Sequence, residues 1–294
     1  AQVDRQLHPS KHLAATQDLV AQGKATYEKH CSACHGLEGR ADGQAAYLLY
    51  PKPRDFVNAK YRLVSTWDGV PTDEDLYHTI SRGMPGSAMP SWAHLTEEIR
   101  WGLVHFVKSL AKEPLVVQAA SDPKEEGEIG TGVIGVSPRP AYTPEARELA
   151  TYYFKEACAG CHGLEGKGDG TQEQVDSEGY ATRPRDLTRG IYKGDPAPEV
   201  VYRRIIAGLP GTPMPMSDWS YGENAWHLAH FVLEMSSDKM RDRNEMIRFE
   251  IPATRVDELP THADSGIWRN TPPVNLHLMP LWWRDQRPEE LTVK

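Results

Sequence analysis

An internal repeat constrains the fold of this chain more than any other feature of its sequence. Residues 31–39 read CSACHGLEG, and residues 158–166 read CAGCHGLEG. Further landmarks follow in the same order in both halves: Asp42-Gly43 and Asp169-Gly170, Pro53-Arg54-Asp55 and Pro184-Arg185-Asp186, Gly83 to Pro90 and Gly208 to Pro215, and Trp101 to Val107 and Trp226 to Val232. This shared order indicates a duplicated domain, with a short insertion before the second Pro-Arg-Asp.

The composition excludes several classes of protein. With 294 residues the chain is long enough for two domains, and 39% apolar and 25% charged residues are typical of a soluble globular protein. No apolar run approaches the roughly 20 residues that a membrane-spanning helix needs. The net charge of -8 argues against nucleic acid or an anionic membrane surface as a partner. A protein partner with a neutral or basic patch fits this charge better.

The start of the chain and its cysteines bear on the compartment. The chain begins Ala1-Gln2-Val3, with neither an initiator methionine nor an apolar leader. We therefore expect a mature periplasmic or otherwise extracytoplasmic product that has lost a signal peptide, although a shortened chain would begin in the same way. The four cysteines form two C-x-x-C pairs rather than the scattered set of a disulfide framework.

The fold class is predicted to be all-α. Apolar and aromatic residues at helical spacing predict a helix leading into each cysteine pair. Thr72 or Asp73 is expected to cap one later helix, and Thr96 another. The expected helices span residues 17–34, 72–80, 96–110, 144–161 and 199–207. The stretches rich in Gly and Pro between them are predicted to be ordered loops.

The repeat predicts that the chain is divided into four segments. We expect a first domain at residues 1–112, a linker rich in Gly, Pro and acidic residues at 113–140, a second domain at 141–237, and a C-terminal extension at 238–294. The extension has no counterpart in either copy. It is expected to be irregular, and either a partial β domain or a docking segment.

The C-x-x-C-H segment is the attachment signature of c-type haem. Two thiols about one helical turn apart can each reach one vinyl group of the same porphyrin, and the next residue presents an imidazole to the iron. Cys31 and Cys34 are therefore expected to attach one haem, with His35 as its proximal ligand. The second haem is expected to be held in the same way by Cys158, Cys161 and His162.

Two other interpretations of a C-x-x-C pair are open, namely a redox disulfide and half of a zinc site. A thioredoxin-type motif normally lies beside a βαβ pattern, which is absent from this sequence. A zinc site would bring both pairs together, but each pair has its own domain. Two matching copies therefore favour haem.

A haem that transfers electrons needs a sixth iron ligand, usually Met or His, and a methionine thioether raises the reduction potential. Met89 and Met214 align with each other, and each is followed by proline. Met84 aligns with Leu209 and is therefore not shared. Met89 and Met214 are the expected distal ligands, and the alternative is that they fill gaps in the core.

Histidines compete for the same role. His105 and His230 also align, but both are expected on the last helix of their copy, where a hydrogen-bonded structural histidine is the more ordinary explanation. His30 has Ala157 at its position in the second copy and is not shared.

Four further residues are expected near the haems. Arg54 and Arg185 suit haem propionates because a guanidinium matches a planar carboxylate, although an ion pair with the aspartate that follows each arginine is equally open. Trp92 and Trp219 follow the methionine loops and are expected to pack on the haem edge, unless they belong to the core. The carbonyl of a nearby proline is expected to accept the N–H of each proximal imidazole.

These motifs resemble a known family. Residues 17–112 and 144–235 each resemble a class I cytochrome c domain, with a helix into C-x-x-C-H, a Met-Pro loop and a closing aromatic helix. Together they are similar to a di-haem cytochrome c of the c4-like kind. The resemblance implies two tandem all-α domains and two covalently bound haem c groups.

The C-terminal extension carries a second resemblance. Residues 264–276, DSGIWRNTPPVNL, resemble the start of the haem-b-binding γ-subunit domain of ethylbenzene dehydrogenase. That family serves molybdenum enzymes, including nitrite oxidoreductases, so the resemblance implies a molybdenum oxidoreductase complex as partner. The segment is too short for the whole domain, and no haem b ligand can be transferred to it.

Two functions remain in competition. If His and Met saturate both irons, the chain is a carrier and not an enzyme, and it passes single electrons between a redox enzyme and a respiratory acceptor. The alternative is a haem enzyme, such as a di-haem peroxidase or a thiosulfate-oxidising cytochrome. A peroxidase needs a displaceable iron position, and a thiosulfate enzyme favours a cysteine ligand, whereas all four cysteines are needed for attachment.

Overall fold

The computed structural model describes residues 7–125, 128–217, 220–238 and 240–241. Within these residues the chain is built from helices and loops, and β-pairing is limited to isolated bridges, which confirms the predicted all-α class. No helix in this described part combines the length and the apolar character needed to cross a membrane. Almost all of the expected C-terminal extension, with residues 264–276, lies outside the described residues.

The first copy begins with α2 (Gln17–His30), which is followed by α3 (Ser32–His35), the 3-10 turn η1 (Ala46–Leu48), α4 (Asp73–Arg82) and α5 (Glu97–Ser109). Threonine side chains cap three of these helices: Thr16, Thr72 and Thr96 each accept a hydrogen bond from the first turn. Asp75 completes a capping box with Thr72. The two caps predicted from the sequence are therefore present.

The second copy repeats this order. It contains α6 (Pro144–Tyr153), the π-helical turn η2 (Phe154–Cys158), α7 (Ala159–His162), the 3-10 turn η3 (Leu187–Arg189), α8 (Pro198–Ala207) and α9 (Glu223–Glu234). The sequence predicted one continuous helix into each cysteine pair. Instead, the helix ends at the first cysteine or passes through a π turn, and a short new helix carries the second cysteine and the histidine.

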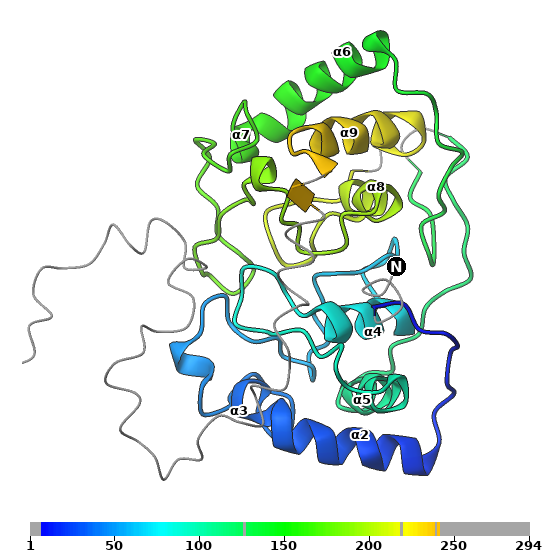
Figure 1. Ribbon diagram of the computed structural model, residues 1–294, viewed down its shortest axis with the longest axis vertical. Coiled ribbons are helices and arrows are strands. Elements are labelled where there is room, and N and C mark those ends of the chain that lie inside the picture. The colour runs from blue at the N-terminus through cyan, green and yellow to red at the C-terminus, as the bar shows by residue number, and fades with distance from the viewer. Residues whose placement is uncertain (1–6, 126–127, 218–219, 239, 242–294) are drawn as a thin grey trace, which may run out of the picture. The chain divides into compact units, whose positions relative to one another are not determined.

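The core of each copy is formed where its first and last helices pack together. Helix α2 lies beside α5, and α6 lies beside α9 (Figure 1). Gly23 and Gly102 meet at the first crossing, where a Cβ atom on Gly23 would come within 2.0 Å of the Gly102 carbonyl oxygen. The rings of Tyr27 and Phe106 lie 5.1 Å apart at the same interface. Only small residues allow the two backbones to come this close.

The described residues of the predicted linker, 113–125 and 128–140, contact both copies. The Ile134 N–H donates to the Ser65 carbonyl of the first copy (2.9 Å), and Arg203 of the second copy donates to the Ile134 carbonyl (2.9 Å). Ile134 itself is fully buried. The indole of Trp226 donates to the Ser137 carbonyl at 3.0 Å, as Trp101 does to the Lys11 carbonyl in the first copy. The end of the linker therefore packs on α9 as the N-terminal segment packs on α5.

Among the described residues three ion pairs join the copies directly: Arg54 with Glu178 at 3.4 Å, and two that are more deeply buried. Arg62 of the first copy pairs with Asp176 of the second at 2.7 Å, with 10% and 7% of the two side chains exposed. Arg82 pairs with Asp195 at 3.2 Å. Asp176 belongs to the stretch before the second Pro-Arg-Asp, residues 171–183, which we call the insertion loop. Pairs this well buried require both partners, because a single buried charge is strongly destabilising.

Candidate functional site

A pocket in the first copy brings together the residues that the sequence singles out. Its wall contains Cys31, Cys34, His35 and Met89. The apolar part of the lining includes Leu49, Phe56, Tyr61, Leu76, Ile80 and Val107. Two thiols that can form thioethers with a porphyrin lie around one apolar space with an imidazole and a methionine sulfur that can bind its iron, so these residues fit a c-type haem.

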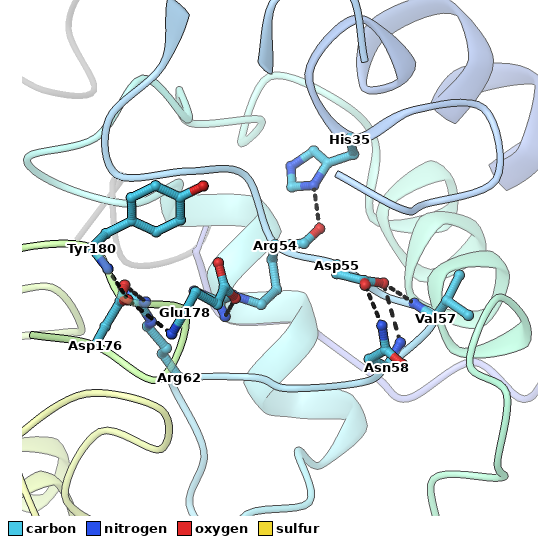
Figure 2. A network of polar contacts seen from close by, with 9 residues as sticks. All are labelled: His35, Arg54, Asp55, Val57, Asn58, Arg62, Asp176, Glu178 and Tyr180. Atoms are coloured by element: carbon cyan, nitrogen blue, oxygen red, sulfur yellow. Dashed lines mark hydrogen bonds and ion pairs between the residues drawn. The ribbon is translucent and has the colours of Figure 1, made fainter. Parts of the chain in front are cut away.

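The proximal histidine of the first copy is held by the backbone. His35 is the last residue of α3, and its Nδ1 atom lies 3.1 Å from the Arg54 carbonyl oxygen (Figure 2). The Phe56 ring stacks on the imidazole at 4.5 Å. With Nδ1 donating to a carbonyl, Nε2 keeps its lone pair for a metal. The sequence predicted a proline carbonyl as the acceptor, but the acceptor belongs to the arginine of Pro-Arg-Asp.

Burial affects both proximal histidines in the same direction. It lowers the pKa of His35, and the hydrogen bond to the Arg54 carbonyl partly offsets this change. It also lowers the pKa of His162, where the nearby Arg185 carbonyl has the same opposing effect. The Nδ1 atom of His162, however, has no hydrogen bond of regular geometry. Both imidazoles are therefore kept in the neutral form that a metal ligand requires.

The four cysteines form no disulfide with one another. Burial raises the pKa of Cys31 to about 12 and that of Cys158 to about 11. Redox-active C-x-x-C pairs shift in the opposite direction, because their chemistry needs a thiolate. Among the described residues no cluster of three or more His, Cys, Asp or Glu side chains is arranged to hold a metal ion, so the zinc interpretation gains no support.

The two methionine loops have the same construction. The Met84 N–H donates to the Met89 carbonyl (3.1 Å), and the Leu209 N–H donates to the Met214 carbonyl (3.0 Å). In each loop a hydroxyl two residues before the methionine accepts its N–H at 3.2 Å. Met84 lines the pocket together with Met89. The choice of Met89 as distal ligand therefore still depends on the repeat, in which Leu209 occupies the position of Met84.

The rival histidines are engaged elsewhere. His105 Nε2 lies 2.7 Å from the Leu13 carbonyl oxygen, and Arg139 donates to His230 Nε2 at 2.8 Å. Both histidines are buried on the last helix of their copy, and His105 is absent from the pocket lining. Their contacts are those of structural histidines.

The two arginines of Pro-Arg-Asp differ in their surroundings. Arg54 lines the pocket of its own copy, and its guanidinium lies 3.4 Å from Glu178 in the insertion loop (Figure 2). Arg185 instead reaches into the first copy and donates to the Pro85 carbonyl at 2.6 Å. Neither arginine pairs with the aspartate that follows it, because Asp55 and Asp186 accept hydrogen bonds from their own loops.

The expected tryptophans also differ. Trp92 lines the pocket and lies beside His30, with the ring centres 5.4 Å apart. Trp219 lies outside the described residues. At the position that matches Trp92 in the repeat, the second copy has Ser217.

Sequence reasoning missed three cations of the same pocket. Lys52, Arg62 and Lys193 belong to its wall. Lys193 comes from the second copy, so no motif or spacing within the first copy points to it. Only the packing of one copy against the other brings it to this pocket.

Comparison with known proteins identifies both copies. Residues 18–107 match the family described as cytochrome c oxidase, cbb3-type, subunit III, and residues 148–236 match the cytochrome c family. Among solved structures, a chain of the Kuenenia stuttgartiensis reducing HAO-like protein complex is 35% identical. The similarity covers 76% of this chain and 98% of that chain, with a TM-score of 0.63. No curated protein matches the sequence significantly.

Proposed function

Because this chain belongs to the cytochrome c family, with two such domains in tandem and two covalently bound haem c groups, we propose that it is a carrier of single electrons within a redox complex. A bound haem supplies an iron that alternates between the ferrous and ferric states. The proposed domains are residues 1–112 and 141–237, joined by the linker at 113–140.

We assign the attachment of the first haem to Cys31 and Cys34, with His35 and Met89 as axial ligands. The observation that carries this assignment is the common pocket of these four residues. The second assignment, to Cys158, Cys161, His162 and Met214, follows from the matching helix, glycine and methionine-loop geometry of the second copy. For both haems, the protein buries the proximal imidazole so that it stays neutral, and a backbone hydrogen bond across each methionine loop fixes the loop's conformation.

The axial ligands of the irons distinguish an electron carrier from a haem enzyme. If a methionine occupies the sixth coordination position of each iron, neither metal has a free position for peroxide or another small substrate. Carbon monoxide should then leave the absorption spectrum of the reduced protein essentially unchanged at neutral pH. Rapid binding of carbon monoxide at one haem would instead support the alternative of a haem enzyme such as a di-haem peroxidase.

We propose an HAO-like protein as the electron-transfer partner. The support is the 35% identical chain, which belongs to a complex named for such a protein. A molybdenum oxidoreductase is the second candidate, and it depends only on residues 264–276, outside the described residues. Purification of the complex from its native source under mild conditions distinguishes the two, because the co-purifying subunit is either HAO-like or contains molybdenum.

We place the protein outside the cytoplasm, and specifically in the periplasm. Cytochrome c domains of this kind are typically extracytoplasmic. Fractionation of cells, followed by detection of covalent haem in the periplasmic extract, tests the location.

A further inference from the structure

Lys193 lies in the second domain but lines the pocket of the first. It follows η3 and precedes α8, in a segment anchored on both sides. The hydroxyl of Tyr192 donates to the Val232 carbonyl of its own domain at 3.2 Å, and Asp195 pairs with Arg82 of the first domain at 3.2 Å. The position of Lys193 at the wall of the first pocket is therefore fixed by the contact between the domains.

The surroundings of Lys193 are strongly cationic. Burial, together with the positive charges of Arg185, Arg62, Arg204 and Arg54, lowers the pKa of Lys193 to about 8. Each of these effects disfavours the charged form of the ammonium. An anion in the adjoining pocket would supply a negative charge and restore the protonated form.

The other cations of the cluster already have partners. Arg62 pairs with Asp176, and Arg54 pairs with Glu178. Arg204 donates to the carbonyls of Arg62 and Gly208, while Arg185 donates to that of Pro85. Lys193 differs, because no hydrogen bond or ion pair joins its ammonium group to another of the described residues. A partly buried ammonium without a partner, facing a pocket, indicates that the ligand of the pocket completes it.

We propose that Lys193 binds a carboxylate of the haem in the first domain, so that the second domain supplies a propionate ligand to the first domain's cofactor. The inference depends on the proposed haem site in the first pocket. Haem c carries two propionates, and a lysine ammonium binds a carboxylate through charge-assisted hydrogen bonds. The interaction adds the haem itself to the ion pairs that join the domains.

The electrostatic consequence is specific to one haem. A positive charge at the edge of the first haem disfavours removal of an electron and therefore raises the reduction potential of that haem. Replacing Lys193 with methionine removes the charge and keeps most of the side-chain volume. The second haem, whose proximal ligand lies in the other domain, should be little affected.

The test uses full-length holoprotein and four variants. Lys193→Met removes the ammonium, Lys193→Arg keeps the charge, and Lys112→Met removes an exposed lysine of the first domain as a matched control. Met89→His marks which of the two measured potentials belongs to the first haem, because histidine in place of a thioether lowers it. Spectroelectrochemical titration gives the potentials, and reduced-minus-oxidised infrared spectra report the carboxylate bands of the propionates.

We expect Lys193→Met to lower the reduction potential of the first haem, which is the potential that Met89→His also lowers, and to shift an infrared band of a propionate. In Lys193→Arg and Lys112→Met, this potential and this band should stay close to those of the wild type. An unchanged first potential, a shift confined to the other haem, or a potential shift without an infrared change would overturn the inference. The count of covalent haems per chain is measured on the same samples. A count below two in the wild type would refute the proposed haem sites themselves, whereas a count of two with no effect of Lys193→Met refutes only this contact.

Discussion

The guanidinium of Arg185, in the second domain, donates a hydrogen bond to the carbonyl oxygen of Pro85, which lies 2.6 Å away in the methionine loop of the first domain. A Cβ atom on Gly86 would come within 2.4 Å of this guanidinium, so the glycine leaves room for it. The loop that presents Met89 is therefore braced by a residue of the neighbouring domain. Arg54, its counterpart in the repeat, pairs instead with Glu178 of the insertion loop, in which the neighbouring Ser177 N–H donates to the Gly211 carbonyl of the second methionine loop at 3.1 Å.

Replacing Arg185 with methionine should loosen the Met89 loop. The lost hydrogen bond involves a charged group, and we expect it to cost about 1.5–3 kcal/mol in the free energy of unfolding. The near-infrared charge-transfer band of the methionine-ligated ferric first haem should weaken or disappear at a lower denaturant concentration. Arg183→Met is the matched control, because Arg183 is exposed and lies two positions away. Equal behaviour of the two variants would show that the brace has no role.

Substitution of the two methionines in the first pocket should separate the ligand from its neighbour. Met89→Leu should remove the methionine charge-transfer band of the first haem and allow carbon monoxide to bind there. Met84→Leu copies the residue found at position 209 and should keep the band. Near-infrared spectra of the two oxidised variants decide the matter. If Met84→Leu abolishes the band and Met89→Leu does not, the repeat has given the wrong ligand.

The ion pair between Arg62 and Asp176 should make the association of the domains sensitive to acid. Burial raises the pKa of Asp176, but hydrogen bonds from the Tyr180 N–H, the Arg62 guanidinium and the Glu178 N–H outweigh it, so the pKa lies below its ordinary value of 3.8. The carboxylate therefore stabilises the folded state fully above about pH 4. This contribution is lost as the pH falls through the lowered pKa.

Asp176→Asn tests this dependence. At pH 7 the substitution should destabilise the protein by about 3 kcal/mol, because it leaves Arg62 buried without its countercharge. Below pH 4 the difference between wild type and variant should shrink. Urea unfolding followed by circular dichroism across this pH range measures both. A difference that stays constant from pH 7 to pH 3 would be inconsistent with an ionised Asp176.

The contact between Gly23 and Gly102 should not tolerate a methyl group. In Gly23→Ala the new Cβ atom would lie 2.0 Å from the Gly102 carbonyl oxygen, which forces α2 and α5 apart. Even though alanine favours a helix, we expect a net loss of about 1–3 kcal/mol in the free energy of unfolding. Gly194→Ala is the control, because its Cβ atom would meet only Val200 at 3.4 Å. Thermal unfolding of both variants provides the measurement.

Much of the fold can be predicted from the repeated sequence. The helices that carry the C-x-x-C-H motifs, the threonine caps and the all-α class are local properties, fixed by helical spacing and by side chains that bond to their own first turn. The break at Cys31 and the π turn before Cys158 could not be predicted, because the residues there do not disfavour a continuous helix. The repeat also predicts that Met89 is the distal ligand opposite His35, and both residues line the same pocket.

The contacts between the domains could not be predicted from the sequence. The sequence predicts that Arg185 binds a haem propionate, and it does not reveal that the guanidinium also donates to the Pro85 carbonyl of the other domain. Nothing in the spacing around Lys193 indicates that it lines a pocket more than a hundred positions earlier in the chain. Such contacts depend on how two folded surfaces meet, and the insertion loop makes that meeting asymmetric despite the symmetric repeat.

We propose that the iron of each of the two covalently attached haems is bound by one histidine and one methionine. Quantitative near-infrared magnetic circular dichroism of the oxidised holoprotein, with the haem content determined on denatured material, measures this ligation. We predict two covalent haems per chain and a methionine band with the intensity of two ligated irons. An intensity corresponding to one iron or to none, at a haem content of two, would show that at least one iron has no methionine ligand.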